Sequence, residues 1–189
     1  GPHALAAATL IAPRVTVAYC NAGAAPIGLL SSDEFFDHMD PENVRRFRAA
    51  LRPREEAHRE LSPELEMGLN AAQIDPARLL GRMKVPESDT AILRQQGAEI
   101  AKTMIEALRP GFWGFVDDFS ALSKDWGFDP RAAHAPVVIE YGISDVNVPA
   151  AHGAWLAKNI SSSRVVVTQA GHLSVSEGIL KRLQFAAAL

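Results

Sequence analysis

The run Pro136-Val137-Val138-Ile139-Glu140-Tyr141-Gly142 decides the fold class of this chain. It is short, rich in β-branched residues and bounded by proline and glycine, which is typical of a buried parallel strand. Residues 14–20 and 164–169 share this pattern. Helical patterns accompany the strands at residues 4–10, 149–159 and 173–189. The alternation of strands and helices predicts an α/β fold with a parallel sheet.

A long helical segment separates the first expected strand from the second. Asp40-Pro41, Ser62-Pro63 and Asp75-Pro76 each place a capping residue before a proline at the first helical position, and a longer helix is expected from Ser88. An excursion of roughly ninety residues is far longer than an ordinary connection and usually covers a site. We therefore predict core segments at 1–30 and 126–189, with a helical cap at 31–125.

Composition narrows the class of protein. The chain has 189 residues, of which 48% are hydrophobic, and a net charge of -3. We expect a soluble globular protein without a membrane span or signal peptide, and without the basic surface that nucleic acids require. A single cysteine, Cys20, forms neither an internal disulfide nor a thiolate metal site, which favours a cytoplasmic location.

Two polar residues follow the second and third expected strands directly. Asp145 lies in Gly142-Ile143-Ser144-Asp145, and His172 follows Gly171. Loops at the carboxyl ends of parallel strands converge, and an aspartate followed by a histidine is the order of the last two members of a Ser…Asp…His relay. In such a relay the carboxylate accepts a hydrogen bond from one ring nitrogen, so that the other nitrogen can take the proton of the nucleophile. Asp145 and His172 are therefore the candidate catalytic pair. The structural alternatives are a turn aspartate and a loop or capping histidine.

Aromatic residues and the other histidines carry weaker signals. Phe112, Trp113 and Phe115 are candidates for lining a substrate pocket, with ordinary core packing as the alternative. Four histidines lack the spacing of metal ligands and are expected at the surface or at interfaces, namely His38, His58, His134 and His152.

The chain resembles the α/β-hydrolase superfamily, in particular bacterial hydrolases with a helical cap, over its whole length. The resemblance rests on Asp145 with Val148-Pro149, on Gly171-His172, and on the opening residues 1–8 followed by Pro13-Arg14-Val15. It implies hydrolysis of a small ester, amide or related substrate through a covalent serine intermediate. Asp145 would orient His172, which would act as general base and then as general acid. The resemblance implies no cofactor and no metal.

The nucleophile elbow of that family, G-x-S-x-G, occurs nowhere in this sequence. The resemblance places the elbow and the earlier strands upstream of residue 1, so we expect the chain to be inactive alone. Its expected partner is the upstream half of the domain, or a second copy that pairs with the open edge of the strand at 14–20. Two alternatives stay open: a relative with an aspartate nucleophile, such as an epoxide hydrolase or dehalogenase, and a truncated or degenerate module without catalysis.

Overall fold

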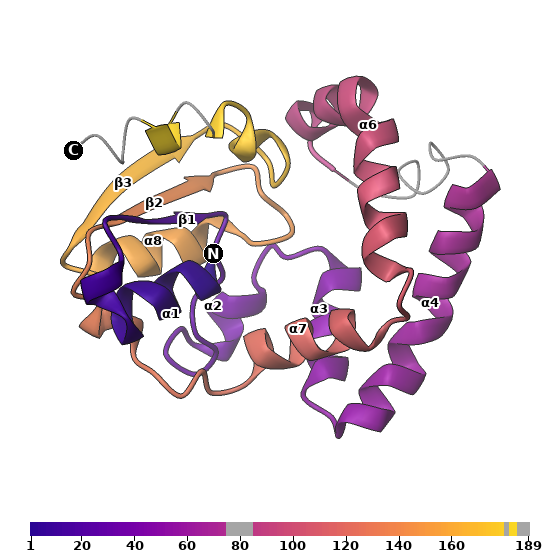
Figure 1. Ribbon diagram of the computed structural model, residues 1–189, viewed down its shortest axis with the longest axis horizontal. Helices are drawn as coiled ribbons and strands as arrows, with labels where there is room; N and C mark the ends of the chain where they lie inside the picture. Colours follow the sequence, from indigo (N-terminus) through magenta and orange to yellow (C-terminus); the bar gives the residue numbers. More distant parts are fainter. Residues whose placement is uncertain (75–84, 180–181, 185–189) are drawn as a thin grey trace. The chain divides into compact units, whose positions relative to one another are not determined.

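Three parallel strands form the sheet of the computed structural model, which describes residues 1–74, 85–179 and 182–184. The strands β1 (Ala18–Asn21), β2 (Val137–Gly142) and β3 (Ser163–Thr168) pair in the order β1-β2-β3 (Figure 1). Ile139 of β2 lies between Cys20 of β1 and Val165 of β3. The predicted α/β class with a parallel sheet is thereby confirmed.

The first strand is shorter than the sequence predicts. Residues 14–17 lie outside β1, and the preceding Ala12–Arg14 form the 3-10 turn η1. Backbone bonds from Arg14 N to Ile11 O and from Val15 N to Ala12 O, both 2.9 Å, close this turn. Pro13 favours it because its ring fixes φ near the helical value, whereas the β-branched residues alone favour a strand.

Two helices cover one face of the sheet. In Figure 1, α1 (Pro2–Leu10) and α8 (Ala150–Asn159) lie on the same side of the strands, and Leu5 of α1 and Leu156 of α8 are fully buried. Gly153 allows α8 to approach β2 closely, because a Cβ there would lie 2.2 Å from the ring of Tyr141. Since side chains alternate along a strand, Glu140 points to the opposite face.

The opposite face carries the segment that follows β3. This segment contains the 3-10 turn η3 (Ser174–Ser176) and residues 182–184. The sequence predicts a continuous helix over 173–189. Residues 173–178 instead form η3 and turns, whereas residue 179 and residues 182–184 are helical. The chain turns at Gly178, whose φ of 74° lies in the left-handed region that glycine adopts at little cost.

The start of α1 lies against the turn that follows β1. A Cβ on Gly1 would lie 2.4 Å from Gly23 Cα, and a Cβ on Gly23 would lie 2.3 Å from Cys20 Sγ. Both positions therefore require glycine for this close approach. Cys20 is fully buried, and burial raises the pKa of its thiol to about 11.

Contacts divide the chain into two units, Gly1–Met39 with Asp125–Leu189, and Asp40–Lys124. Residues 31–39, which the sequence pattern assigns to the helical cap, belong to the unit that holds the sheet. The short helix α2 (Ser32–Phe36) is the reason, because its Phe35 is fully buried against His152 of α8. The turn η2 (Pro130–Ala132) also belongs to this unit.

The second unit consists of helices in its described part. These are α3 (Pro41–Ala50), α4 (Arg54–Ile74), α6 (Glu87–Leu108) and α7 (Trp113–Ser123). Its buried apolar core contains Ala49, Ala57, Leu61 and Val116. The predicted helix start at Asp40-Pro41 is confirmed, because the Asp40 carboxylate accepts the amides of Glu42 and Asn43 at 2.9 and 3.4 Å. No described helix is long and apolar enough to cross a membrane.

The expected helix start at Ser62-Pro63 is wrong. Pro63 lies inside α4, which begins after Pro53, where the Pro53 carbonyl accepts the amides of Glu56 and Ala57. Proline removes one backbone donor from a helix. Here the helix continues because Ala57 and Leu61, on its inner face, are buried in the core of the unit. The expected start at Asp75-Pro76 lies outside the described residues.

Gly142, at the end of β2, provides a test of this packing. A Cβ there would lie 2.1 Å from the carbonyl oxygen of Ala170, a backbone atom that cannot move aside independently. We expect Gly142→Ala to lower the free energy of unfolding by roughly 1–3 kcal/mol, as overpacking does. Urea denaturation followed by circular dichroism measures the change.

Gly114→Ala is the matched control. Gly114 lies in α7, and a Cβ there would meet no neighbouring atom within 4 Å, so this substitution should stabilise its helix by about 0.5–1 kcal/mol. Equal effects of the two substitutions would contradict the close approach of β2 to the loop after β3.

Candidate active site

Backbone hydrogen bonds join the loops that follow β2 and β3. Gly142 pairs with Thr168 in the sheet, and beyond it Ile143 N donates to Thr168 O at 3.0 Å. Ser144 N then donates to Ala170 O at 3.1 Å. The two loops therefore leave the sheet side by side, which brings the residues that follow them into reach of each other.

Asp145 is held by the turn that leads into α8. The residue is 4% exposed, and its Oδ1 accepts the amides of Asn147 and Val148 at 2.8 and 2.9 Å. These two donors stabilise the ionised carboxylate and fix its plane. The second oxygen, Oδ2, is left to accept a different donor.

His172 provides that donor. Its Nδ1 lies 2.8 Å from Asp145 Oδ2, so the contact expected from the sequence is present. Because a carboxylate only accepts, Nδ1 carries the proton in this contact and Nε2 is the basic nitrogen of the neutral ring. Nε2 has no hydrogen-bond partner within the part of the chain that the structure describes, and the side chain is 32% exposed. The ring is thus oriented and able to exchange a proton at Nε2.

The amino end of α1 lies at the same edge of the sheet. Asp145 and His172 follow the carboxyl ends of β2 and β3, and Gly23, which contacts Gly1, follows the carboxyl end of β1. In parallel strands these ends share one edge. The unit therefore brings an acid, a base and the positive end of a helix dipole to one edge of the sheet.

His152 is buried, although the sequence predicted a surface or interface position. Its Nδ1 accepts the amide of Ala25 at 3.1 Å, and its Nε2 lies 2.9 Å from the carbonyl oxygen of Phe35, to which it donates. Burial lowers its pKa to about 4, so the ring is neutral and joins α8 to the segment after β1. The spacing of His152 and Leu156 on one helical face is the signal that could have indicated burial.

The candidate pocket residues all lie at the start of α7 in the second unit. Phe115 packs against that unit's apolar core and, at 4.8 Å between ring centroids, against Phe119. Phe112 is half-buried at the amino end of the helix. Phe115 therefore takes part in ordinary core packing, which was the alternative to a role in lining a pocket.

Trp113 has a polar setting. Its ring stacks on His58 with centroids 3.8 Å apart, and the guanidinium of Arg54 lies 4.0 Å from its centre. Arg54 also binds the Asp117 carboxylate through two hydrogen bonds of 2.7 and 2.8 Å. Trp113 remains 38% exposed.

Among the described residues, His, Cys, Asp and Glu side chains form no group of three that could hold a metal ion.

Comparisons with known proteins bear on the fold. No protein-family model matches the chain, and no curated protein matches it in sequence. A crystal structure of a hydrolase from Pseudomonas aeruginosa PA01 is similar, with a TM-score of 0.51 and 18% identity. The match covers 98% of this chain and 58% of the other, so the chain spans less than two thirds of that protein. The likeness shows a hydrolase-like fold.

The buried His152 predicts a pH dependence of stability. Its pKa is about 4 in the folded chain and about 6.5 when unfolded, so only the unfolded chain takes up this proton between those values. The free energy of unfolding should therefore fall by roughly 3 kcal/mol as the pH drops from about 6.5 to about 4. Urea denaturation across this range measures the slope.

Two variants assign that slope to one ring. His152→Gln should lower stability at neutral pH, through lost hydrogen bonds, and flatten the dependence on pH. His134→Gln alters an exposed histidine of the same unit and should leave the slope unchanged. A slope that persists in His152→Gln would show that other groups produce it.

Proposed function

We propose that this chain supplies the acid and the base of a serine hydrolase relay that acts on a small ester, amide or related substrate. One observation carries the proposal, namely the 2.8 Å contact between Asp145 Oδ2 and His172 Nδ1. The serine is proposed in a segment upstream of residue 1. The similar structure from Pseudomonas aeruginosa is called a hydrolase, which agrees with this function.

The proposed roles follow from the hydrogen bonds of the pair. His172 Nε2 removes the serine proton while the serine oxygen attacks the substrate carbonyl carbon, and the imidazolium is stabilised by Asp145. His172 then gives this proton to the leaving group as the tetrahedral intermediate collapses to the acyl-enzyme. Water repeats the sequence, with its proton passing through Nε2, and releases the acid and the serine. Because amides already hold Oδ1 of Asp145, only Oδ2 faces the ring.

The position of α1 supports a nucleophile next to its amino end. In the strand–turn–helix arrangement of a nucleophile elbow, the serine lies between a strand and the helix that follows it. Gly1 is the N-cap residue of α1 and lies at the edge of the sheet where Asp145 and His172 lie. A serine just before this helix would therefore be within the same group of loops as the base.

The test compares the 189-residue chain with the same chain extended through the preceding codons of its reading frame. The extended protein should react with a fluorophosphonate probe and cleave a chromogenic short-chain ester, whereas the 189-residue chain should do neither. Asp145→Asn should lower kcat by about 10⁴-fold, since the ring loses its oriented tautomer, and His172→Ala by at least as much.

Matched controls are Asp129→Asn and His134→Gln. Asp129 is a partly exposed carboxylate that pairs with Arg131, and His134 is exposed, so neither substitution should change kcat beyond about twofold. Cleavage that survives His172→Ala would overturn the proposal, as would a probe-labelled serine within residues 1–189. An aspartate at the centre of the upstream elbow would overturn the serine chemistry in favour of an epoxide hydrolase or dehalogenase.

A further inference from the structure

Glu140 is a buried carboxylate on β2 that the proposed relay does not use. It is 1% exposed and faces away from α1 and α8. Three donors converge on its Oε2: Tyr19 Oη at 2.6 Å, Asn21 Nδ2 at 3.1 Å and Arg182 Nε at 3.0 Å. Its other oxygen, Oε1, has no hydrogen-bond partner among the described residues. The carboxylate therefore acts through a single oxygen.

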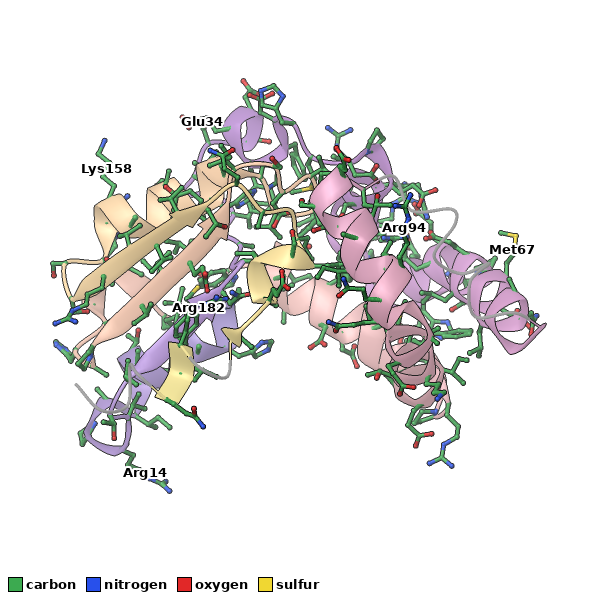
Figure 2. All side chains as sticks on the ribbon, turned by 90° about the horizontal axis from the view of Figure 1, so that it is seen from above. Arg14, Glu34, Met67, Arg94, Lys158 and Arg182 are labelled. Atoms are coloured by element: carbon green, nitrogen blue, oxygen red, sulfur yellow. The ribbon has the colours of Figure 1, made fainter. Side chains whose placement is uncertain are left out.

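Two of these donors continue to the turn that follows His172. Arg182 donates from Nη2 to the carbonyl of Val175 at 2.8 Å and from Nη1 to that of Glu177 at 2.7 Å. Figure 2 labels Arg182 beside the sheet. Asn21 Oδ1 accepts the hydroxyl of Ser176 at 2.9 Å. The carboxylate on β2 is thus connected to the backbone of residues 175–177 by both donors.

That turn begins at the candidate base itself. Val175 N donates to Gly171 O at 3.2 Å, and Gly171 N donates to the hydroxyl of Ser174 at 2.8 Å, so residues 171–175 form one hydrogen-bonded turn around His172. Asp145 thus fixes the ring of His172, while the hydrogen bonds of the turn fix its backbone. The side chain of Glu140 is connected to this turn and, within the part of the chain that the structure describes, makes no hydrogen bond to the side chain of Asp145.

We propose that Glu140, acting through Arg182 and Asn21, is a positioning residue that holds the turn of His172 so that its Nδ1 meets Asp145. The inference rests on the proposed function for its catalytic meaning. Arg182 matches the carboxylate in charge and forms an ion pair with it, and its guanidinium also reaches the two carbonyls that Glu140 itself does not contact. Tyr19 stays protonated as a donor, because burial and then the bond to Glu140 raise its pKa.

The experiment reads the tautomer of His172 by ¹⁵N NMR in the 189-residue chain, at a pH where histidines are neutral. In the parent chain, His172 should show the Nδ1–H form with a slowly exchanging proton. In Glu140→Gln and in Arg182→Gln the two tautomers should interconvert, and the Nδ1 proton should exchange about tenfold faster, as expected when a hydrogen bond is weakened.

The two substitutions separate positioning from charge. Glu140→Gln removes a negative charge and Arg182→Gln removes a positive one, so a through-space effect on the ring would have opposite signs in the two variants. A common loss of the Nδ1–H form supports positioning. Asp129→Asn, which removes the carboxylate of another arginine pair in the same unit, should leave the tautomer unchanged.

Folding failure does not prevent the test. Asn21→Ala and Ser176→Ala each remove uncharged groups of the network, and circular dichroism verifies that they fold. A parent-like tautomer and exchange rate in these folded variants, or opposite changes in the two charge variants, would overturn the proposal.

The outcome is separate from that of the proposed function. The tautomer measures geometry without any substrate, so an extended protein that cleaves no ester would remove the function but leave the positioning intact. Conversely, an active extended protein whose variants retain the parent tautomer and the parent kcat would remove the positioning alone. If both proposals hold, Glu140→Gln in the extended protein lowers kcat and leaves KM unchanged.

Discussion

The pairing of β2 with β3, continued past the strands by two loop hydrogen bonds, is the constraint on which the candidate site depends. The bonds from Ile143 to Thr168 and from Ser144 to Ala170 keep the loops together where the sheet itself has ended. Gly142 permits this, because any side chain there would meet the Ala170 carbonyl. Backbone geometry therefore brings Asp145 and His172 together, and the hydrogen bond between their side chains adds to it.

Two buried carboxylates five residues apart are stabilised in different ways. Asp145 is held by two backbone amides through Oδ1, and its Oδ2 accepts a hydrogen bond from the His172 ring, which in the proposed relay would become an imidazolium. Glu140 forms an ion pair with Arg182, and its Oε2 accepts hydrogen bonds from Tyr19 and Asn21. The environment of Asp145 is compatible with a change of charge on the neighbouring ring, whereas the contacts of Glu140 stabilise a fixed arrangement.

How much the sequence can predict depends on how far apart the interacting residues lie. Local patterns suffice for β2 and β3, since β-branched runs end at proline and glycine, and for the Asp145–His172 contact, since both residues follow strands. They fail at residues 14–17, where Pro13 closes a turn, and at Pro63, where tertiary packing continues a helix. They place His152 at the surface or an interface, although it is buried, and they assign no role to Glu140. The partners of these two residues, Ala25 and Tyr19, lie 127 and 121 residues away.

Cys20 of β1 is buried near the start of α1, so the reactivity of its thiol can report on the packing of this helix. Thiols react as thiolates, and a pKa of about 11 leaves almost none at neutral pH, so the folded chain should be inert to maleimides. Gly23 lies directly against the sulfur and is itself approached by Gly1, so opening this contact would expose the thiol. Cys20 is the single thiol of the sequence, so its rate of modification by a maleimide would measure how often the amino end of α1 leaves the sheet.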